Sequence, residues 1–86
     1  MNSLETLYRV KNVDFFLCIG VCDSMNDARK KAGICRDHAF KLVKRWKTAE
    51  WITVYEGTYD YTEVGARIVK GFHTMGWIGG KNERNR

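Results

Sequence analysis

Apolar residues recur at helical spacing along much of this chain, and the first clear pattern predicts a buried helix over residues 13–22. Asn12 is placed to cap this helix, and Asp14 suits its first turn. The apolar positions of the pattern include Val13, Phe16, Leu17 and Ile19. The preceding segment, residues 2–10, stays open between a helix and a strand, because its first residues suit a helix start and its last residues suit a strand.

Two further helices are predicted on either side of a glycine. Ser24, with Asp27 three residues later, resembles a capping box and starts a short helix that ends at Gly33. Its inward positions are Met25, Ala28 and Ala32. A longer helix follows over residues 36–50, with Cys35 at its N-cap position. The core face of this helix consists of Ala39, Val43 and Trp46. Two helices joined by so short a turn must cross steeply, as in a helix-turn-helix.

After these helices the period changes from helical to alternating. Residues 52–61 alternate around Glu56-Gly57, which predicts a β-hairpin with a tight turn. Thr62 is placed to cap a last helix. The inward stripe of that helix consists of Val64, Ile68, Val69 and Phe72. We therefore expect one domain over residues 1–78, followed by a flexible polar tail over residues 79–86.

Composition fits one small domain, because 86 residues, 44% of them hydrophobic, leave no room for a second core. The net charge of +5 is unevenly distributed. Residues 29–47 hold eight basic residues and one acidic residue, Asp37, which gives this segment a charge of +7. Charge concentrated in this way favours a polyanionic partner through counterion release.

Other classes of protein are disfavoured by what the chain lacks. No apolar run approaches the ~18 residues that a membrane span requires, and the first residues do not have the layout of a signal peptide. We expect a cytoplasmic protein with no membrane association. Neither a Gly-rich phosphate loop nor a paired-carboxylate motif occurs, and His73 has no acid or nucleophile at a meaningful spacing. We therefore expect no enzyme activity and no cofactor.

The three cysteines allow more than one interpretation. An odd number without extracellular markers favours free thiols over disulfides. A four-ligand zinc site can be drawn from Cys18, Cys22, Cys35 and His38, but its spacing matches no standard pattern. Buried cysteine as a small apolar residue is the commoner case, so no metal is expected. Cys35, beside Arg36 at a helix start, is the best placed of the three for redox sensing.

Four aromatic residues are candidates for stacking on single-stranded nucleic acid: Trp46, Trp51, Tyr59 and Tyr61. Their helical and alternating spacing fits packing in the core and hairpin better. We therefore predict that they are structural.

The order of these elements resembles the winged helix-turn-helix of the MarR-type transcription regulators. The residues that carry the resemblance are Ala28 to Lys31, Gly33-Ile34-Cys35, Ala39 to Trp46, Ala49 with Trp51-Ile52, and Tyr61-Thr62-Glu63-Val64-Gly65. The resemblance covers roughly residues 12 to 73. It implies an α+β, mainly helical fold with a three-helix core, a two-stranded β-hairpin wing and a C-terminal helix. A stand-alone domain of this size is similar to small regulators encoded by phages, archaeal viruses and plasmids.

The resemblance also implies a function, which is sequence-specific binding of double-stranded DNA to regulate transcription, as a repressor. Residues 36–47 would lie in the major groove. The residues expected to read bases are Arg36, Asp37, His38 and Lys41. Those expected to contact phosphates are Arg29, Lys30, Lys31, Lys44, Arg45 and Lys47. Because a single module buries only about 600–1,000 Å² on DNA, we expect a homodimer. Its candidate interface is Leu4, Leu7, Phe72, Met75, Trp77 and Ile78.

Two alternatives stay open. Phe40 on the DNA-facing side and the acidic Glu56 and Asp60 of the hairpin favour a small interaction protein that binds and inhibits a host protein. A third possibility is architectural DNA binding without sequence preference, which predicts no discrimination between sites.

Overall fold

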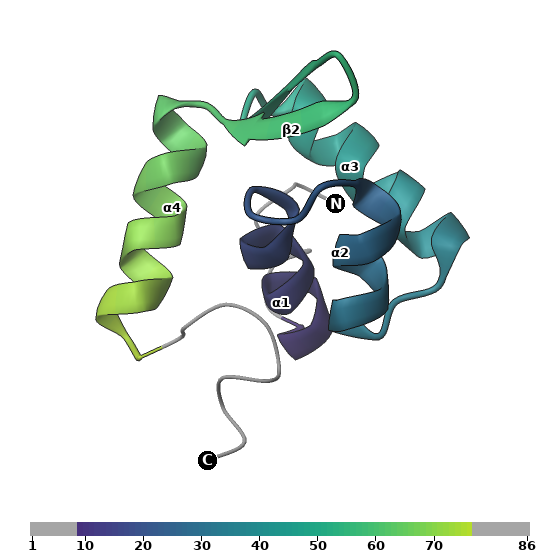
Figure 1. Ribbon diagram of the computed structural model, residues 1–86. Helices are drawn as coiled ribbons and strands as arrows, with labels where there is room; N and C mark the ends of the chain where they lie inside the picture. Colours follow the sequence, from purple (N-terminus) through teal and green to yellow (C-terminus); the bar gives the residue numbers. More distant parts are fainter. Residues whose placement is uncertain (1–8, 77–86) are drawn as a thin grey trace.

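The computed structural model describes residues 9–76, which form a mainly helical α+β fold with a two-stranded antiparallel sheet (Figure 1). The elements in chain order are α1 (Val10–Ile19), α2 (Met25–Ala32), α3 (Arg36–Thr48), β1 (Ile52–Tyr55), β2 (Thr58–Tyr61) and α4 (Glu63–Thr74). The mainly helical α+β class and the order of the elements from α1 to α4 were predicted correctly. The expectations for Leu4, Leu7, Trp77, Ile78 and the tail 79–86 lie outside the described residues.

Helix α1 is central, and eight consecutive residues from Asn12 to Ile19 are buried. The predicted start of this helix was wrong, because α1 begins at Val10 and Asn12 does not cap it. Asn12 lies inside the helix, where its buried amide oxygen bonds to His38 of α3. Asp14, expected in the first turn, lies further along the helix and is fully buried. A helix enclosed on all sides has no polar face to mark its start in the sequence.

The capping signals around α2 were predicted correctly. The Ser24 hydroxyl accepts a hydrogen bond from the Asp27 N–H at 3.2 Å. At the other end Gly33 has a φ of +77°, and the Ile34 N–H donates to the Arg29 carbonyl at 2.9 Å. This is the glycine-ended helix stop in which a left-handed residue redirects the chain. The expected tight turn between α2 and α3 follows from it.

Helix α3 ends at Thr48, two residues before the predicted end. Glu50 adopts a φ of +63°, and the Trp51 N–H donates back to the Trp46 carbonyl at 2.9 Å. The same type of stop therefore ends α3, with Glu50 at the position that glycine usually occupies. Sequence reasoning did not find this stop, because a glutamate there carries no signal.

The core lies between α1 and α3 and contains a cluster of aromatic rings. The buried face of α3 is Ala39, Leu42, Val43 and Trp46, of which Leu42 was not predicted. The fully buried Trp46 ring lies 4.9 Å from the Phe16 ring, edge to face, and 5.5 Å from the Phe15 ring. Tyr61 packs on Phe16 at 5.2 Å. The structural role predicted for Trp46 and Tyr61 is therefore confirmed.

The hairpin has the predicted tight turn, and its two strands pair in an antiparallel register. Ile52 pairs with Tyr61 and Tyr55 with Thr58. Glu56 and Gly57 both have positive φ, at 51° and 80°, which is the turn type that matches the twist of a two-residue hairpin. Only Ile52 of the two strands is fully buried, so most of the hairpin projects from the core.

Helix α4 begins at the predicted cap and lies on the other side of α1 from α2 (Figure 1). The Thr62 hydroxyl accepts from the Gly65 N–H at 3.1 Å and donates to the Glu50 carbonyl. The inward stripe was predicted in part: Ile68, Val69 and Phe72 are half-buried and pack against the core. The prediction that Val64 faces inward was wrong, because this residue is 44% exposed.

Candidate nucleic-acid interface

Helix α3 has two chemically distinct faces. One face is buried in the core, and the residues opposite it are exposed: Arg36, Asp37, Phe40, Lys41, Lys44 and Lys47. These positions recur every three or four residues, so their side chains lie along one side of the helix. Four of them are cationic and one is anionic. The outer face of α3 is therefore a positively charged strip along a helix at the edge of the three-helix core (Figure 1).

An exposed aromatic ring lies within this strip. Phe40 is 48% exposed, and the Arg36 guanidinium carbon lies 5.5 Å from the centre of its ring. This is a cation–π arrangement between residues one helical turn apart. The sequence places both residues on one face, but the stacking of one on the other was not predicted.

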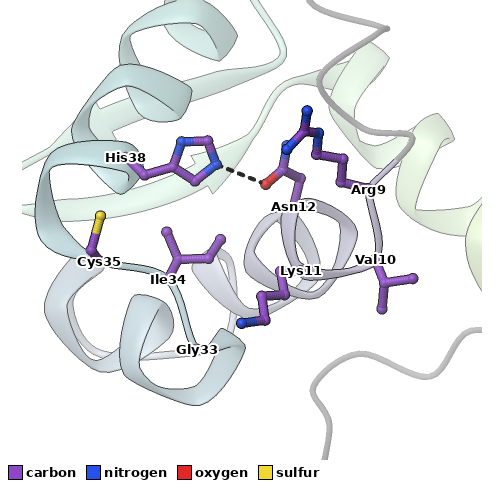
Figure 2. A pocket seen from close by; sticks show the side chains of 8 residues that line it. All are labelled: Arg9, Val10, Lys11, Asn12, Gly33, Ile34, Cys35 and His38. Atoms are coloured by element: carbon purple, nitrogen blue, oxygen red, sulfur yellow. Dashed lines mark hydrogen bonds between the residues drawn. The ribbon is translucent and has the colours of Figure 1, made fainter.

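His38 was expected to face DNA bases, and the structure places its side chain differently. The residue is half-buried, and its Nε2 lies 3.0 Å from the buried Oδ1 of Asn12. Figure 2 shows the two side chains facing each other between α3 and α1. The reason is position: His38 precedes the buried Ala39 and lies four residues before the buried Leu42. Its anchored ring holds α3 against α1, which leaves Arg36, Asp37 and Lys41 as the exposed residues of the predicted reading set.

A hollow of about 370 Å³ opens beside this hydrogen bond, between the start of α1 and the α2–α3 turn (Figure 2). Its lining includes Arg9, Lys11, Ile34 and Cys35. Arg9 and Lys11 are exposed, so they add positive charge near the N-terminus of α3, where the helix dipole is also positive. Sequence reasoning missed both residues, because nothing local connects them to a helix that starts 25 residues after Lys11.

The three basic residues of α2 do not share one role. Arg29 donates from Nε to Asn26 Oδ1 at 2.9 Å and from Nη1 to the Ile34 carbonyl at 3.3 Å. It therefore braces the turn that orients α3, in addition to any phosphate contact. Lys30 and Lys31 are exposed and line a second hollow together with Asp23 and Asp27, whose carboxylates offset part of their charge.

The remaining predicted phosphate contacts belong to α3. Lys44 and Lys47 are exposed on the outer strip, whereas Arg45 is half-buried at its border. The hairpin contributes no cation, since residues 52–61 contain no lysine or arginine and carry Glu56 and Asp60. Positive charge is thus concentrated on α3 itself.

The cysteines are not gathered into one site. Cys18 is buried in the core, Cys22 is half-buried and Cys35 is exposed. Over residues 9–76, no group of three or more His, Cys, Asp or Glu side chains is arranged to hold a metal ion. His38, the fourth residue of the conceivable zinc set, is engaged with Asn12.

Comparison of this chain with protein-family models, with curated proteins and with solved structures gives no match. Among the helices of the described part of the chain, none is long and apolar enough to cross a membrane.

Proposed function

We propose that this protein binds duplex DNA in a sequence-specific manner, with α3 in the major groove. The observation that supports this proposal is the outer strip of α3, whose exposed cations lie opposite a face that anchors the helix in the core. An α-helix fits the width of the major groove, and a recognition helix there reads bases mainly with its N-terminal residues.

The distribution of charge suggests that the two halves of α3 make different DNA contacts. Arg36, Asp37 and Lys41 lie in its first half and would reach base edges, where arginine and lysine donate to guanine and a carboxylate accepts from cytosine. Lys44 and Lys47 lie in its second half and would contact phosphates. Such phosphate contacts supply affinity that decreases steeply with salt concentration.

A DNA-binding domain of this size would regulate transcription, as a repressor where its site overlaps a promoter. One small module buries about 600–1,000 Å² on DNA, which rarely gives tight specific binding alone. We therefore include a second copy of the chain in the proposal. Its interface would include the exposed Met75 at the end of α4, close to the half-buried Phe72, together with the exposed Val64 near the start of the helix.

Fluorescence anisotropy with labelled duplexes at several salt concentrations tests the proposal. Lys44→Ala should weaken binding to every sequence and reduce the slope of log affinity against log salt by about one. Lys70→Ala is the matched control, because it removes the same charge from an exposed position on α4. If both variants bind equally weakly, net charge alone drives binding and α3 is not the interface.

A second candidate function is the binding of a partner protein, and the exposed Phe40 is the observation that favours it. Aromatic residues, phenylalanine among them, are enriched in the buried centres of protein interfaces, and a few anchor residues carry most of the binding energy there. Phe40→Ala would then abolish binding to that partner and leave duplex binding and its salt dependence unchanged.

A further inference from the structure

Phe40 and Arg36 are the one stacked pair on the outer strip of α3, and the pair needs an explanation beyond charge. Lysines alone would be sufficient to bind phosphates, and an exposed ring adds nothing to that contact. The ring instead holds the guanidinium, since a cation over an aromatic face is attracted to it. A guanidinium held in this way loses less conformational entropy when it forms two hydrogen bonds in one plane.

We infer that Arg36 and Phe40 form one reading unit for a thymine beside a guanine. This inference rests on the proposed function and specifies the sequence that the same site recognises. The Arg36 guanidinium would donate to O6 and N7 of the guanine, and the Phe40 ring would pack on the 5-methyl group of the thymine. The thymine methyl is the apolar group that the major groove offers to an exposed aromatic ring.

The spacing of the pair agrees with neighbouring base pairs. Residues 36 and 40 are four apart on a helix, which separates their Cα atoms by about 6 Å along the helix axis. The ring and the guanidinium come closer, at 5.5 Å. Base pairs in duplex DNA are about 3.4 Å apart, and the separation of 5.5 Å is shorter than two such steps. The guanidinium and the ring are therefore close enough together to contact adjacent base pairs. Arg36 is the first residue of α3, and that end of a recognition helix contacts bases.

The test begins with selection of bound duplexes from a random-sequence library by the full chain, followed by anisotropy on the enriched duplexes. Each thymine is then replaced by uracil, which removes only the methyl group, and each guanine by 7-deazaguanine, which removes N7. Replacement of one thymine next to an essential guanine by uracil should reduce the affinity for the duplex about fourfold, which is the value expected for one buried methyl group. The 7-deazaguanine substitution at that guanine should cost about fivefold or more.

Variants assign these effects to the two side chains. Phe40→Ala should bind the thymine and uracil duplexes equally. Arg36→Ala, which removes the donor, should lose the preference for guanine over its 7-deaza analogue. Val21→Ala, an exposed apolar position in the turn between α1 and α2, should retain both preferences. Thermal unfolding of each variant verifies that it is folded.

The outcomes separate the inference from the function on which it rests. If the chain binds no duplex even at low salt, the proposed function is wrong. If it binds duplexes but enriches no thymine–guanine step, or does not distinguish thymine from uracil, the reading unit is wrong and DNA binding remains.

Discussion

At the scale of single residues, the Tyr61 hydroxyl links the hairpin to the end of α1. It lies within bonding distance of the Phe16 and Leu17 carbonyl oxygens and accepts from the Gly20 N–H at 3.3 Å. These backbone groups belong to the last turn of α1, where carbonyls lack helical partners. The predicted helix end at residue 22 was wrong, because α1 ends at Ile19. At this end the Tyr61 hydroxyl of β2 forms hydrogen bonds with backbone groups of the helix terminus.

Tyr61 should make stability depend on alkaline pH. Burial raises the pKa of its phenol well above the usual value of about 10. Because the folded state holds the proton more tightly than the unfolded state, this contribution is complete below pH ~10 and decreases as the pH rises above that value. Tyr61→Phe should reduce the free energy of unfolding by about 1–2 kcal/mol at neutral pH. Above pH ~10 the free energy of unfolding of this variant should decrease less steeply with pH than that of the wild type.

Urea denaturation of the wild type and the variant across neutral to alkaline pH measures this difference. Tyr55→Phe is the control, because Tyr55 is on the same hairpin but 72% exposed. Its profile should match that of the wild type. Parallel profiles for wild type and Tyr61→Phe would show that the Tyr61 proton does not contribute.

At the scale of elements, α4 is positioned by a close approach of backbones. A Cβ added to Gly65 would lie 2.0 Å from the Trp51 carbonyl oxygen, which already accepts the Thr62 N–H at 3.0 Å. The Trp51 carbonyl cannot move away without losing the hydrogen bond from the Thr62 N–H. Gly65 cannot move away without losing the bond from its N–H to the Thr62 hydroxyl, which caps α4. The same contact fixes the rotation of the helix, which explains why Val64 turns to solvent although the helical period predicted it inside.

Gly65→Ala should therefore destabilise the protein by about 1–3 kcal/mol, as overpacked sites do. Gly71→Ala is a matched control within α4, because a Cβ there has no neighbour within 4 Å. It should stabilise the protein by about 0.5–1 kcal/mol through the helix propensity of alanine. Chemical denaturation measures both values, and equal effects of the two substitutions would contradict the close contact.

Local signals explain which elements could be predicted from the sequence. Ser24, Gly33 and Thr62 act on backbone groups within five residues, so their roles were predicted correctly. Asn12 looks like the same kind of cap, but its partner His38 is 26 residues away, and no local pattern shows such a pairing. For the candidate site, helical periodicity predicted the exposed strip of α3, but not the inward turn of His38 or the bracing role of Arg29.

At the scale of the whole molecule, the charged strip and the apolar edge of α4 lie on different elements. Helix α3 packs against the core on one side of α1, and α4 lies on the other side (Figure 1). A second copy could therefore contact α4 without covering the strip on α3. The dimer that we propose would use this arrangement to present two α3 helices to successive major grooves.

Met75→Glu should reduce dimerisation, because Met75 is 70% exposed at the end of α4 and a charge there would be buried between copies. A two-fold dimer reads half-sites about 34–36 Å apart, so affinity for a duplex with two half-sites should decrease by at least about tenfold. Affinity for a single half-site should hardly change. Thr74→Glu places the same charge on the neighbouring exposed residue and is the control. Analytical ultracentrifugation with both duplexes measures these effects, and a wild type that binds its full site as a monomer would contradict the proposed dimer.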